Sequence, residues 1–558
     1  MRCLRSPSCD GAPANYDVAR TLVGPVGTVE IESMSSQCRR RGSIGERQER
    51  WAGIGESHPS RKVRGKDGAP TFVVGAEKTR AMGPPPEGRY LLCYVRCVNS
   101  SLWKIGFVLV ACALLLHEGM AQGVGQAAPE NSVTRDIDPE IAAQVYSIRA
   151  IDNHAHPVLP PPGDRADRDF DALPVDNMEP ETDVVAWRAD NPQLPAAWKA
   201  LWGFDAPANF HAPLDEAGLK RLAALRDVVK AREGSHYDEW VLDRANIGVM
   251  VANRVTMGPG LEEPRFRWVP YADALLFPFD TSLLAAATPD KKLFFPMEDK
   301  LRARYLEALG LKGVPGTLGE YLMKVVTPTL ERQRAGGAIA EKFEIAYLRG
   351  FDFSNPSREE AERIYAKWVG KAAPDSAEYK VLQDFLFRYI AAECGRLGMA
   401  VHLHTLAGGG GYFGIAGANP MLLEPVLNDA RLRKTKFVML HGGWPFVREA
   451  GALLQKPNVY LDLSQESLMF PPRTLAIWLR EWLETFPEKV LFGTDGYALS
   501  ESVGWEETTW IANRNARQAL ALALTGMVRD GEISRGRAGV IAEEVMRGSA
   551  EGVYGAHK

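Results

Sequence analysis

Two histidines separated by one residue, His154 and His156, are the side chains whose type and spacing most directly suggest chemistry. They follow the apolar run from Val145 to Ile151, which has the pattern of a buried strand. Successive side chains of a strand point to opposite faces, so both imidazoles are expected to project from the same face. Imidazoles are common ligands of divalent metals, and this pair predicts half of a metal site. Such a pair also arises by chance, so the prediction depends on ligands from other strands.

A second pair, His402 and His404, lies in the run Met399–Thr405 and shares one face of a predicted strand. Ligands gather at the carboxyl ends of parallel strands. We therefore expect His404, which is nearer that end, to be the ligand. We expect His402 one layer lower, as an ordinary buried histidine with a hydrogen bond inside the fold.

Two further strand-like runs end in side chains suited to metal chemistry. Phe437–His441 ends in a histidine before two glycines that turn the chain, and Val490–Asp495 ends in an aspartate. His441 is placed as a metal ligand or a general acid or base. Asp495 could bind a metal and take a proton from water. An aspartate at such a turn is often a helix N-cap, but four histidines at other strand ends favour a functional role.

Strand-like runs alternate with amphipathic segments from about residue 135, an order typical of βα units and a parallel sheet. The predicted strands are Ser147–His154, Ile247–Arg254, Phe266–Phe277, Phe343–Phe351, Met399–His404, Phe437–His441, Val459–Leu463 and Val490–Thr494. Helical signals lie between them, at Leu219–Arg232, Glu359–Val369, Tyr379–Leu397, Pro420–Ala430 and Arg473–Thr485. This predicts an α/β fold, a (β/α)8 TIM barrel over residues 135–555, with the active site at the carboxyl ends of its strands.

Two loops are predicted to lie near that site. Residues 158–215 form a long insertion after the first strand, rich in Pro, Asp and Trp. It is either a lid or substrate wall, or a packing decoration without substrate contact. The run Gly408–Gly411 lacks the Lys-Ser/Thr that a phosphate-binding P-loop needs, so it predicts a flexible active-site loop after the fifth strand.

The order of these residues resembles the amidohydrolase superfamily, in its amidohydrolase-related (metal-dependent hydrolase) branch. The shared pattern is His-x-His after strand one, a histidine after strands five and six, and an aspartate after strand eight. The stretches from His441 to Gly451, from Asn458 to Ser464 and from Val490 to Asp495 are similar to the amidohydrolase-like half of nodulin-type proteins fused to a glutamine-synthetase-like domain. The resemblance covers roughly residues 140–555.

This resemblance implies hydrolysis of an amide or related C–N bond through an activated water. The ion would be divalent, with zinc favoured over manganese or iron, and the implied ligands are His154, His156, His404 and Asp495. Asp495 would also move the proton, and His441 would polarise the substrate or stabilise charge on its carbonyl oxygen.

Two other functions remain open on the sequence alone. A decarboxylase could use the same site, with the metal binding the acid substrate and His441 and Asp495 handling protons. Arg254, Arg349 or Arg448 could pair with the substrate carboxylate; Arg254, Arg349 and Trp444 are the predicted substrate-binding side chains. A non-catalytic binding protein on a barrel scaffold is the third reading, although all five site positions are filled. Lys342 could match a lysine of related sequences that is carboxylated and bridges metal ions, but it is expected instead to be a surface lysine before the fourth strand.

The amino-acid composition limits the classes of partner that are expected. The 558 residues are 24% charged, with a net charge of −4 and no long basic stripe, which argues against nucleic acid. A small-molecule substrate is expected, and a homo-oligomer is possible.

The amino-terminal region differs from the rest of the chain. Residues 1–100 are predicted to be disordered or a spurious upstream extension. Residues 101–121, with the apolar run Ile105–Leu116, are predicted to be a signal peptide cleaved near Gln122. The protein is then expected to be exported, to a periplasm, or to be membrane-anchored if the signal is not cleaved. Six of seven cysteines precede that point, which leaves Cys394 without an intramolecular disulfide partner.

Overall fold

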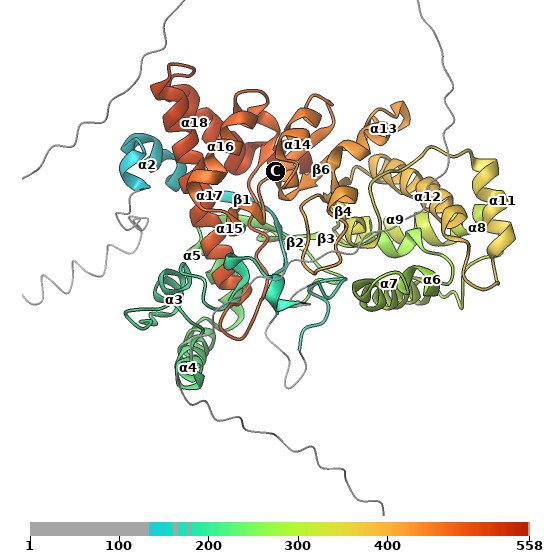
Figure 1. Cartoon of the computed structure of the whole chain (residues 1–558), viewed down its shortest axis with the longest axis horizontal. Coiled ribbons are helices and arrows are strands. Elements are labelled where there is room, and N and C mark those ends of the chain that lie inside the picture. Colours follow the sequence, from blue (N-terminus) through green and yellow to red (C-terminus); the bar gives the residue numbers. More distant parts are fainter. Residues whose placement is uncertain (1–132, 160–165, 176–178, 556–558) are drawn as a thin grey trace, which may run out of the picture. The chain divides into compact units, whose positions relative to one another are not determined.

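The computed structural model describes residues 133–159, 166–175 and 179–555 (Figure 1). The predicted extension at 1–100 and the predicted signal at 101–121 lie outside these residues. Within the described part of the chain, every helix is too short or too polar to cross a bilayer.

Eight parallel strands form the centre of the fold. Their bounds are β1 Ala150–Ala155, β2 Ile247–Asn253, β3 Phe266–Val269, β4 Ala340–Phe343, β5 Ala400–His404, β6 Phe437–Leu440, β7 Val459–Asp462 and β8 Val490–Leu491. Continuous ladders join β1-β2-β3 and β4-β5-β6-β7-β8 in sequence order. Neighbouring strands are thus consecutive in the chain, as crossover helices in βα units require.

Backbone hydrogen bonds close these two sheets into one barrel. Between β3 and β4, the amide of Ile339 donates to the carbonyl of Trp268 at 3.0 Å, and a parallel bridge pairs Tyr271 with Lys342. Between the end of β8 and β1, the amide of Asn153 donates to the carbonyl of Phe492 at 2.9 Å. Eight parallel strands in a closed ring define a TIM barrel, which confirms the predicted fold class.

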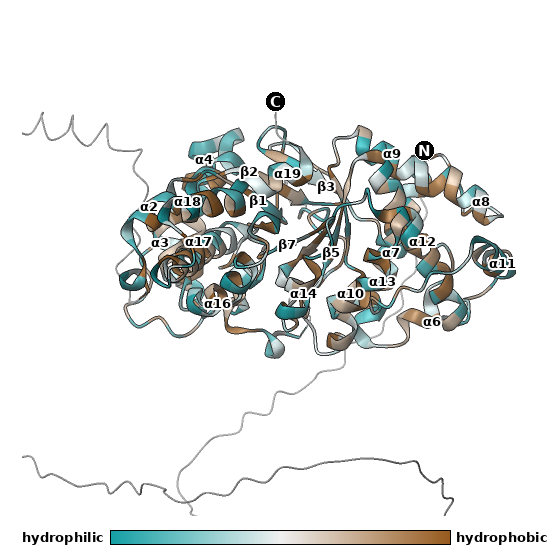
Figure 2. Ribbon diagram, turned by 90° about the horizontal axis from the view of Figure 1, so that it is seen from above, coloured by the Kyte–Doolittle hydropathy of each residue, from teal (hydrophilic) through white to brown (hydrophobic). Residues whose placement is uncertain are grey.

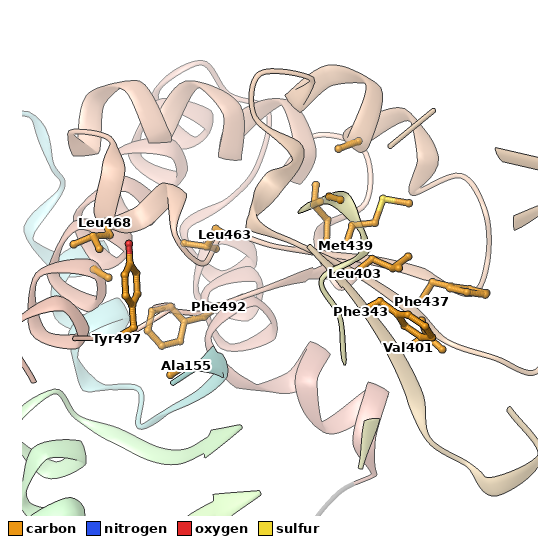
Figure 3. Packing of buried hydrophobic residues seen from close by; sticks show 14 of the residues in the cluster. Ala155, Phe343, Val401, Leu403, Phe437, Met439, Leu463, Leu468, Phe492 and Tyr497 are labelled. Atoms are coloured by element: carbon orange, nitrogen blue, oxygen red, sulfur yellow. The ribbon is translucent and has the colours of Figure 1, made fainter. Parts of the chain in front are cut away.

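Alternation along the strands separates two apolar layers. Val438 and Leu440 of β6 belong to a cluster that fills the barrel, with Ile151 of β1 and Leu491 of β8. The intervening residues of β5 and β6 pack outward against the helices (Figure 3); among them are Val401, Leu403, Phe437 and Met439. On β5 the side chains that point into the barrel are therefore those of His402 and His404. The strand itself lies between the two apolar layers.

Helices surround the strands, and many carry both polar and apolar faces (Figure 2). The longer ones are α2 Pro139–Ser147, α3 Leu194–Trp202, α4 Glu216–Glu233, α5 Tyr237–Arg244, α7 Pro289–Ala308, α9 Thr327–Ala335, α11 Arg358–Trp368, α12 Ser376–Leu397, α14 Val447–Leu453, α16 Pro472–Leu483, α17 Trp505–Arg529 and α18 Arg535–Glu543. Shorter ones include α10 Ile345–Leu348, α13 Glu424–Leu427 and α19 Ser549–Tyr554. Cys394 is a buried free thiol on α12.

Two strand predictions were misplaced. The predicted third strand continued to Phe277, but β3 ends at Val269 and a buried 3-10 turn, Asp273–Leu276, follows. The fourth was predicted at Phe343–Phe351, but β4 is Ala340–Phe343 and α10 comes next. In both cases apolar residues continue into a turn that is itself buried, and an apolar run alone does not separate a strand from such a turn.

Candidate metal centre

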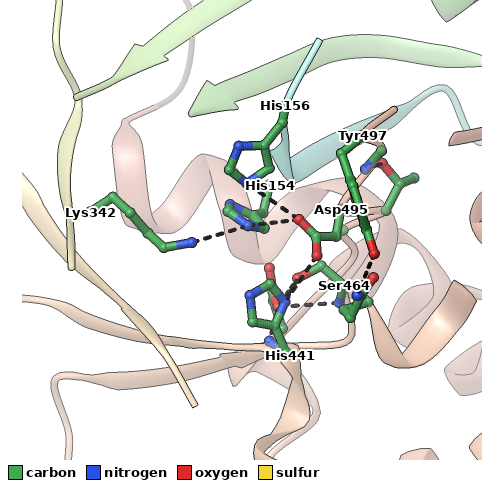
Figure 4. A network of polar contacts seen from close by, with 12 residues as sticks. His154, His156, Lys342, His441, Ser464, Asp495 and Tyr497 are labelled. Atoms are coloured by element: carbon green, nitrogen blue, oxygen red, sulfur yellow. Dashed lines mark hydrogen bonds and ion pairs between the residues drawn. The ribbon is translucent and has the colours of Figure 1, made fainter. Parts of the chain in front are cut away.

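Three side chains from three strand ends converge at the carboxyl end of the barrel (Figure 4). One ligand atom each from His154, His441 and Asp495 lies within 4.8 Å of the other two. Nε2 of His154 is 3.0 Å from Oδ1 of Asp495, and the His154 and His441 rings are 4.9 Å apart. Residues 154, 441 and 495 are far apart in sequence and meet because parallel strands end at one edge of the barrel.

The other two predicted histidines adjoin this group. Nε2 of His156 is 3.5 Å from Oδ1 of Asp495, and its ring is 4.9 Å from that of His154. The His404 ring is 4.6 Å from that of His441. Both side chains line the same cavity as His441 and Asp495. The structure therefore brings together all five side chains that the sequence predicted.

The donor chemistry of this group suits a divalent metal. Burial is the main cause of a lowered pKa at His154, His156, His404 and His441, so the imidazoles are held in the neutral form that binds metals. Nε2 of His404 and Oδ1 of Asp495 are buried without a hydrogen-bond partner. Buried polar atoms are usually paired, and a bound ion would give these atoms a partner.

Hydrogen bonds behind His156 fix its tautomer. Its Nδ1 lies 3.3 Å from the carbonyl oxygen of Phe170, which can only accept, and 3.2 Å from the hydroxyl of Tyr271. That hydroxyl donates to Asp171 at 2.8 Å. Nδ1 of His156 therefore carries the proton, and Nε2, the atom nearer Asp495, carries the lone pair.

A similar chain lies behind His441. Its Nδ1 is 2.9 Å from Oγ of Ser464, and that hydroxyl donates to Oδ1 of Asp462 at 2.7 Å. Because the Ser464 proton is used on Asp462, Ser464 accepts from Nδ1–H of His441, which leaves the lone pair on Nε2. Asp462 also accepts from the His441 amide at 2.8 Å and from Nδ2 of Asn153 at 2.7 Å. Asp462 thus ties β7 to β6 and β1.

A second buried carboxylate fixes the residue that precedes Asp495. Asp152 accepts from the amide of Thr494 at 2.9 Å and from its hydroxyl at 2.5 Å. The Asp495 amide donates to the carbonyl of His154 at 2.7 Å. Burial raises the pKa of Asp495 to about 8, with the nearby Lys342 opposing that rise. The sequence motifs did not single out Asp152 or Asp462, although both are acidic residues within predicted strands.

Backbone strain is concentrated at this centre. Three of the four described non-glycine residues with positive φ are His441 at 70°, Gln465 at 55° and Asp495 at 52°. All three line the cavity. Each such conformation costs roughly 1–3 kcal/mol and persists where the surrounding structure enforces it, commonly at functional sites.

Lys342 is a correction to the sequence prediction. It was expected on the surface, but it lies within β4 with a 1% exposed side chain. Its Nζ is 3.4 Å from Nε2 of His154 and 3.9 Å from Oε1 of Glu344. The strand begins three residues earlier than predicted, so Lys342 points into the barrel instead of preceding it. Its position beside a histidine pair was not visible from its charge alone.

His402 lies where it was expected, a layer below the centre. Its Nε2 is 2.6 Å from the hydroxyl of Tyr554, on α19. His402 is absent from the cavity lining, whereas His404 is part of it.

The insertion after β1 contributes one wall of the cavity. Its lining residues are Asp171, Val175, Asp183 and Trp187, and they face Gly408, Gly409 and Gly410 of the glycine-rich loop. Glu344, Tyr347, Leu406, Gln465, Tyr497 and Leu499 complete the lining with Lys342 and the centre itself. Four residues of the insertion thus line the cavity, and contact of the insertion with substrate stays a prediction.

The three predicted substrate-binding side chains do not line this cavity. Arg254 is buried and uses its guanidinium on Asp167, at 2.8 Å, and on backbone carbonyls. Arg349 pairs with Asp384 at 2.7 Å. Trp444 packs against Phe470 with ring centroids 5.5 Å apart. Both arginines are already paired in the fold.

Comparison with known proteins shows a family similarity over part of the chain. Residues 311–525 match the model of the amidohydrolase family. Protein fluG of Emericella nidulans is 30% identical over 225 residues, which cover 38% of this chain and 25% of that protein. This chain therefore spans about a quarter of the length of that relative. Over residues 311–525 the chain is similar to the amidohydrolase family, in agreement with the resemblance seen in the sequence.

Three solved structures whose backbones resemble this chain are described as different kinds of protein. A protein of Lactobacillus casei described as a metal-dependent hydrolase has a TM-score of 0.47 at 16% identity, covering 74% of this chain and 97% of that one. Uronate isomerase of Thermotoga maritima has a TM-score of 0.46 at 12% identity, covering 76% of this chain and 100% of that one. IDCase of Metarhizium anisopliae has a TM-score of 0.31 at 14% identity, covering 74% of this chain and 98% of that one. TM-scores below 0.5 do not establish a shared fold, so the assignment of the barrel depends on the strand pairing described above.

Proposed function

We propose that this protein is a metal-dependent hydrolase of an amide or related C–N bond. The observation that carries the proposal is the group of four neutral imidazoles and one carboxylate at the end of the barrel, within a chain that matches the amidohydrolase family. His154, His156, His404 and Asp495 would hold a divalent ion, zinc by preference, with manganese or iron as alternatives. When bound, the ion would supply Lewis-acid activation of water and carbonyl.

Asp495 has the position of the proton carrier. It would accept a proton from the attacking water as the water oxygen bonds to the carbonyl carbon. It would then pass that proton to the nitrogen as the C–N bond breaks, so that an acid and an amine leave. The hydrogen bond from its own backbone amide to the His154 carbonyl, and the bonds from Thr494 to Asp152, would hold the backbone that carries this carboxylate.

For His441 the hydrogen bonds favour a different role from the one the resemblance implied. A donor to the substrate oxygen needs an N–H, whereas the contact with Ser464 leaves Nε2 of His441 with a lone pair. We therefore propose His441 as a further ligand or as a proton acceptor.

The decarboxylase reading has less support. It needs a cationic partner for a substrate carboxylate, and Arg254 and Arg349 are paired elsewhere. Lys342 is the one cationic side chain among the described lining residues, apart from the histidines.

The test is metal analysis of the purified protein, followed by a screen of amides and dipeptides after metal loading. We expect one or two ions per chain and equal amounts of amine and acid as products. Release of CO₂ from carboxylic acids, without amide cleavage, would instead establish the decarboxylase.

A further inference from the structure

The charges around the cavity are unevenly distributed. Asp171 and Asp183 from the insertion and Glu344 after β4 line it, in addition to Asp495. No arginine is among the described lining residues, and Lys342 is engaged with His154 and Glu344. The wall beside the metal centre is thus acidic, although the centre itself would bind a cation with its own ligands.

Glu344 is the most deeply buried of the three wall carboxylates and is only partly satisfied. Its residue exposure is 3%, and its Oε2 is buried without a hydrogen-bond partner. Its backbone is fixed, because the Glu344 amide donates to Asp273 at 2.8 Å. A buried carboxylate oxygen without a partner is costly, and burial accordingly raises the pKa of Glu344. A ligand that brings a positive charge to the cavity would offset that cost.

Aromatic rings accompany the carboxylates. Trp187 of the insertion and Tyr347 of α10 both line the cavity, and the Tyr347 ring lies 4.7 Å from that of His404. Aromatic faces beside carboxylates are the combination that recognises alkylammonium groups, through cation–π attraction and charge-assisted hydrogen bonds.

We propose that this wall, with Glu344 as its main determinant, selects substrates that carry a protonated amino group near the scissile C–N bond. The substrate class would be amides with a free ammonium group, such as amides of amino acids or of diamines. This inference rests on the proposed hydrolase function, and Glu344 and Asp183 act in it as specificity determinants that touch the substrate.

The first test measures binding without turnover. Titration calorimetry at pH 7 on the metal-loaded full chain compares n-butylammonium chloride with neutral n-butanol. We expect binding of the ammonium only, weakened about 10- to 100-fold by Glu344→Gln, the usual value of a hydrogen bond to a charged group. Asp183→Asn, at a partly exposed position, should weaken it less and covers the case in which Glu344→Gln fails to fold. Glu181→Gln, an exposed acid of the same insertion outside the lining, is the matched control.

The second test measures selectivity. An amino-acid amide and its N-acetyl derivative differ in one positive charge, and the free amine should have the higher kcat/KM, with the ratio falling in Glu344→Gln. Equal binding of butanol and butylammonium, or an unchanged ratio in the variants, would overturn the acidic subsite. Amide cleavage without ammonium preference would leave the hydrolase standing and remove the subsite. Glu344-dependent ammonium binding without any amide cleavage would do the reverse.

Discussion

The floor and the wall of the cavity are built in different ways. The floor consists of His156, His404, His441 and Asp495, with His154 against it; these side chains sit at the ends of strands and are fixed by barrel register. The wall comes from the insertion, the glycine-rich loop and the turn after β4. Under the proposed function, the reaction would depend on the strand ends, whereas the choice of substrate would depend on the loops. Substitutions in the two regions should therefore affect different kinetic constants.

The largest effect is expected from removing the first ligand pair. His154→Ala with His156→Ala should abolish metal binding and reduce turnover to background, because two of the proposed ligands are lost. Metal content by mass spectrometry and turnover on a cleaved amide measure this. Stability should fall only modestly, by the part that bound metal adds through mass action, about 2.7 kcal/mol at a metal concentration 100-fold above its Kd. Full metal occupancy in the double variant would show that the ligands lie elsewhere.

Asp495→Asn should have the next largest effect. The amide keeps the size of the side chain but cannot accept a proton, and a positioned base is typically worth about 10²–10⁴-fold in rate. We expect kcat to fall by at least about 10²-fold while much of the metal and the fold are retained.

His402→Ala is the control for that variant within the barrel. His402 bonds to Tyr554 below the cavity, so its loss should lower stability and leave much of the activity. Wild-type turnover by Asp495→Asn would contradict the proposed proton transfer. Loss of metal in His402→Ala, but not in His404→Ala, would reverse the choice of ligand on β5.

The floor could be predicted from sequence because each of its residues ends an apolar run, and barrel geometry then brings such ends together. The wall could not, since Asp171, Asp183 and Trp187 lie in an insertion without periodicity. The prediction that Lys342 lies on the surface is wrong for a related reason. The charged residues Glu341 and Lys342 interrupt the apolar pattern of β4, so the strand was placed too late in the chain. Asp152 and Asp462 stabilise the floor through backbone and side-chain hydrogen bonds that no motif reveals.

A wall substitution should alter KM and not kcat. Trp187→Leu removes an aromatic face that would contact the substrate equally in the ground state and the transition state, so it removes uniform binding. A cation–π contact of about 0.5–2 kcal/mol corresponds to a rise in KM of roughly 2- to 30-fold. Steady-state kinetics with an ammonium-bearing amide measures it. Val185→Ala, exposed in the same 3-10 helix, Val185–Trp187, and outside the lining, should change neither constant. A large fall in kcat for Trp187→Leu would remove the distinction between floor and wall.

The smallest effect on turnover is expected from a buried carboxylate that belongs to neither region. Asp238 lies on α5, is 5% exposed, and has an Oδ1 without a hydrogen-bond partner. Burial, with a smaller contribution from Glu506, raises the pKa of Asp238 from 3.8 to about 7. A raised carboxyl pKa means that folding favours the protonated form, so stability is lost as pH rises from about 4 through about 7. The full loss would be up to roughly 4 kcal/mol.

Asp238→Asn removes that charge, so it should unfold at higher urea concentration than wild type at pH 8 and at a similar concentration at pH 4. Its kcat and KM should equal those of the wild type, because Asp238 is outside the cavity lining. Glu344→Gln should likewise relieve the cost of a buried carboxylate, but with a loss of ammonium binding that Asp238→Asn does not share. If both variants gained stability and neither changed binding, Glu344 would be no more than a buried charge like Asp238. The acidic wall would then have no role in selecting the substrate.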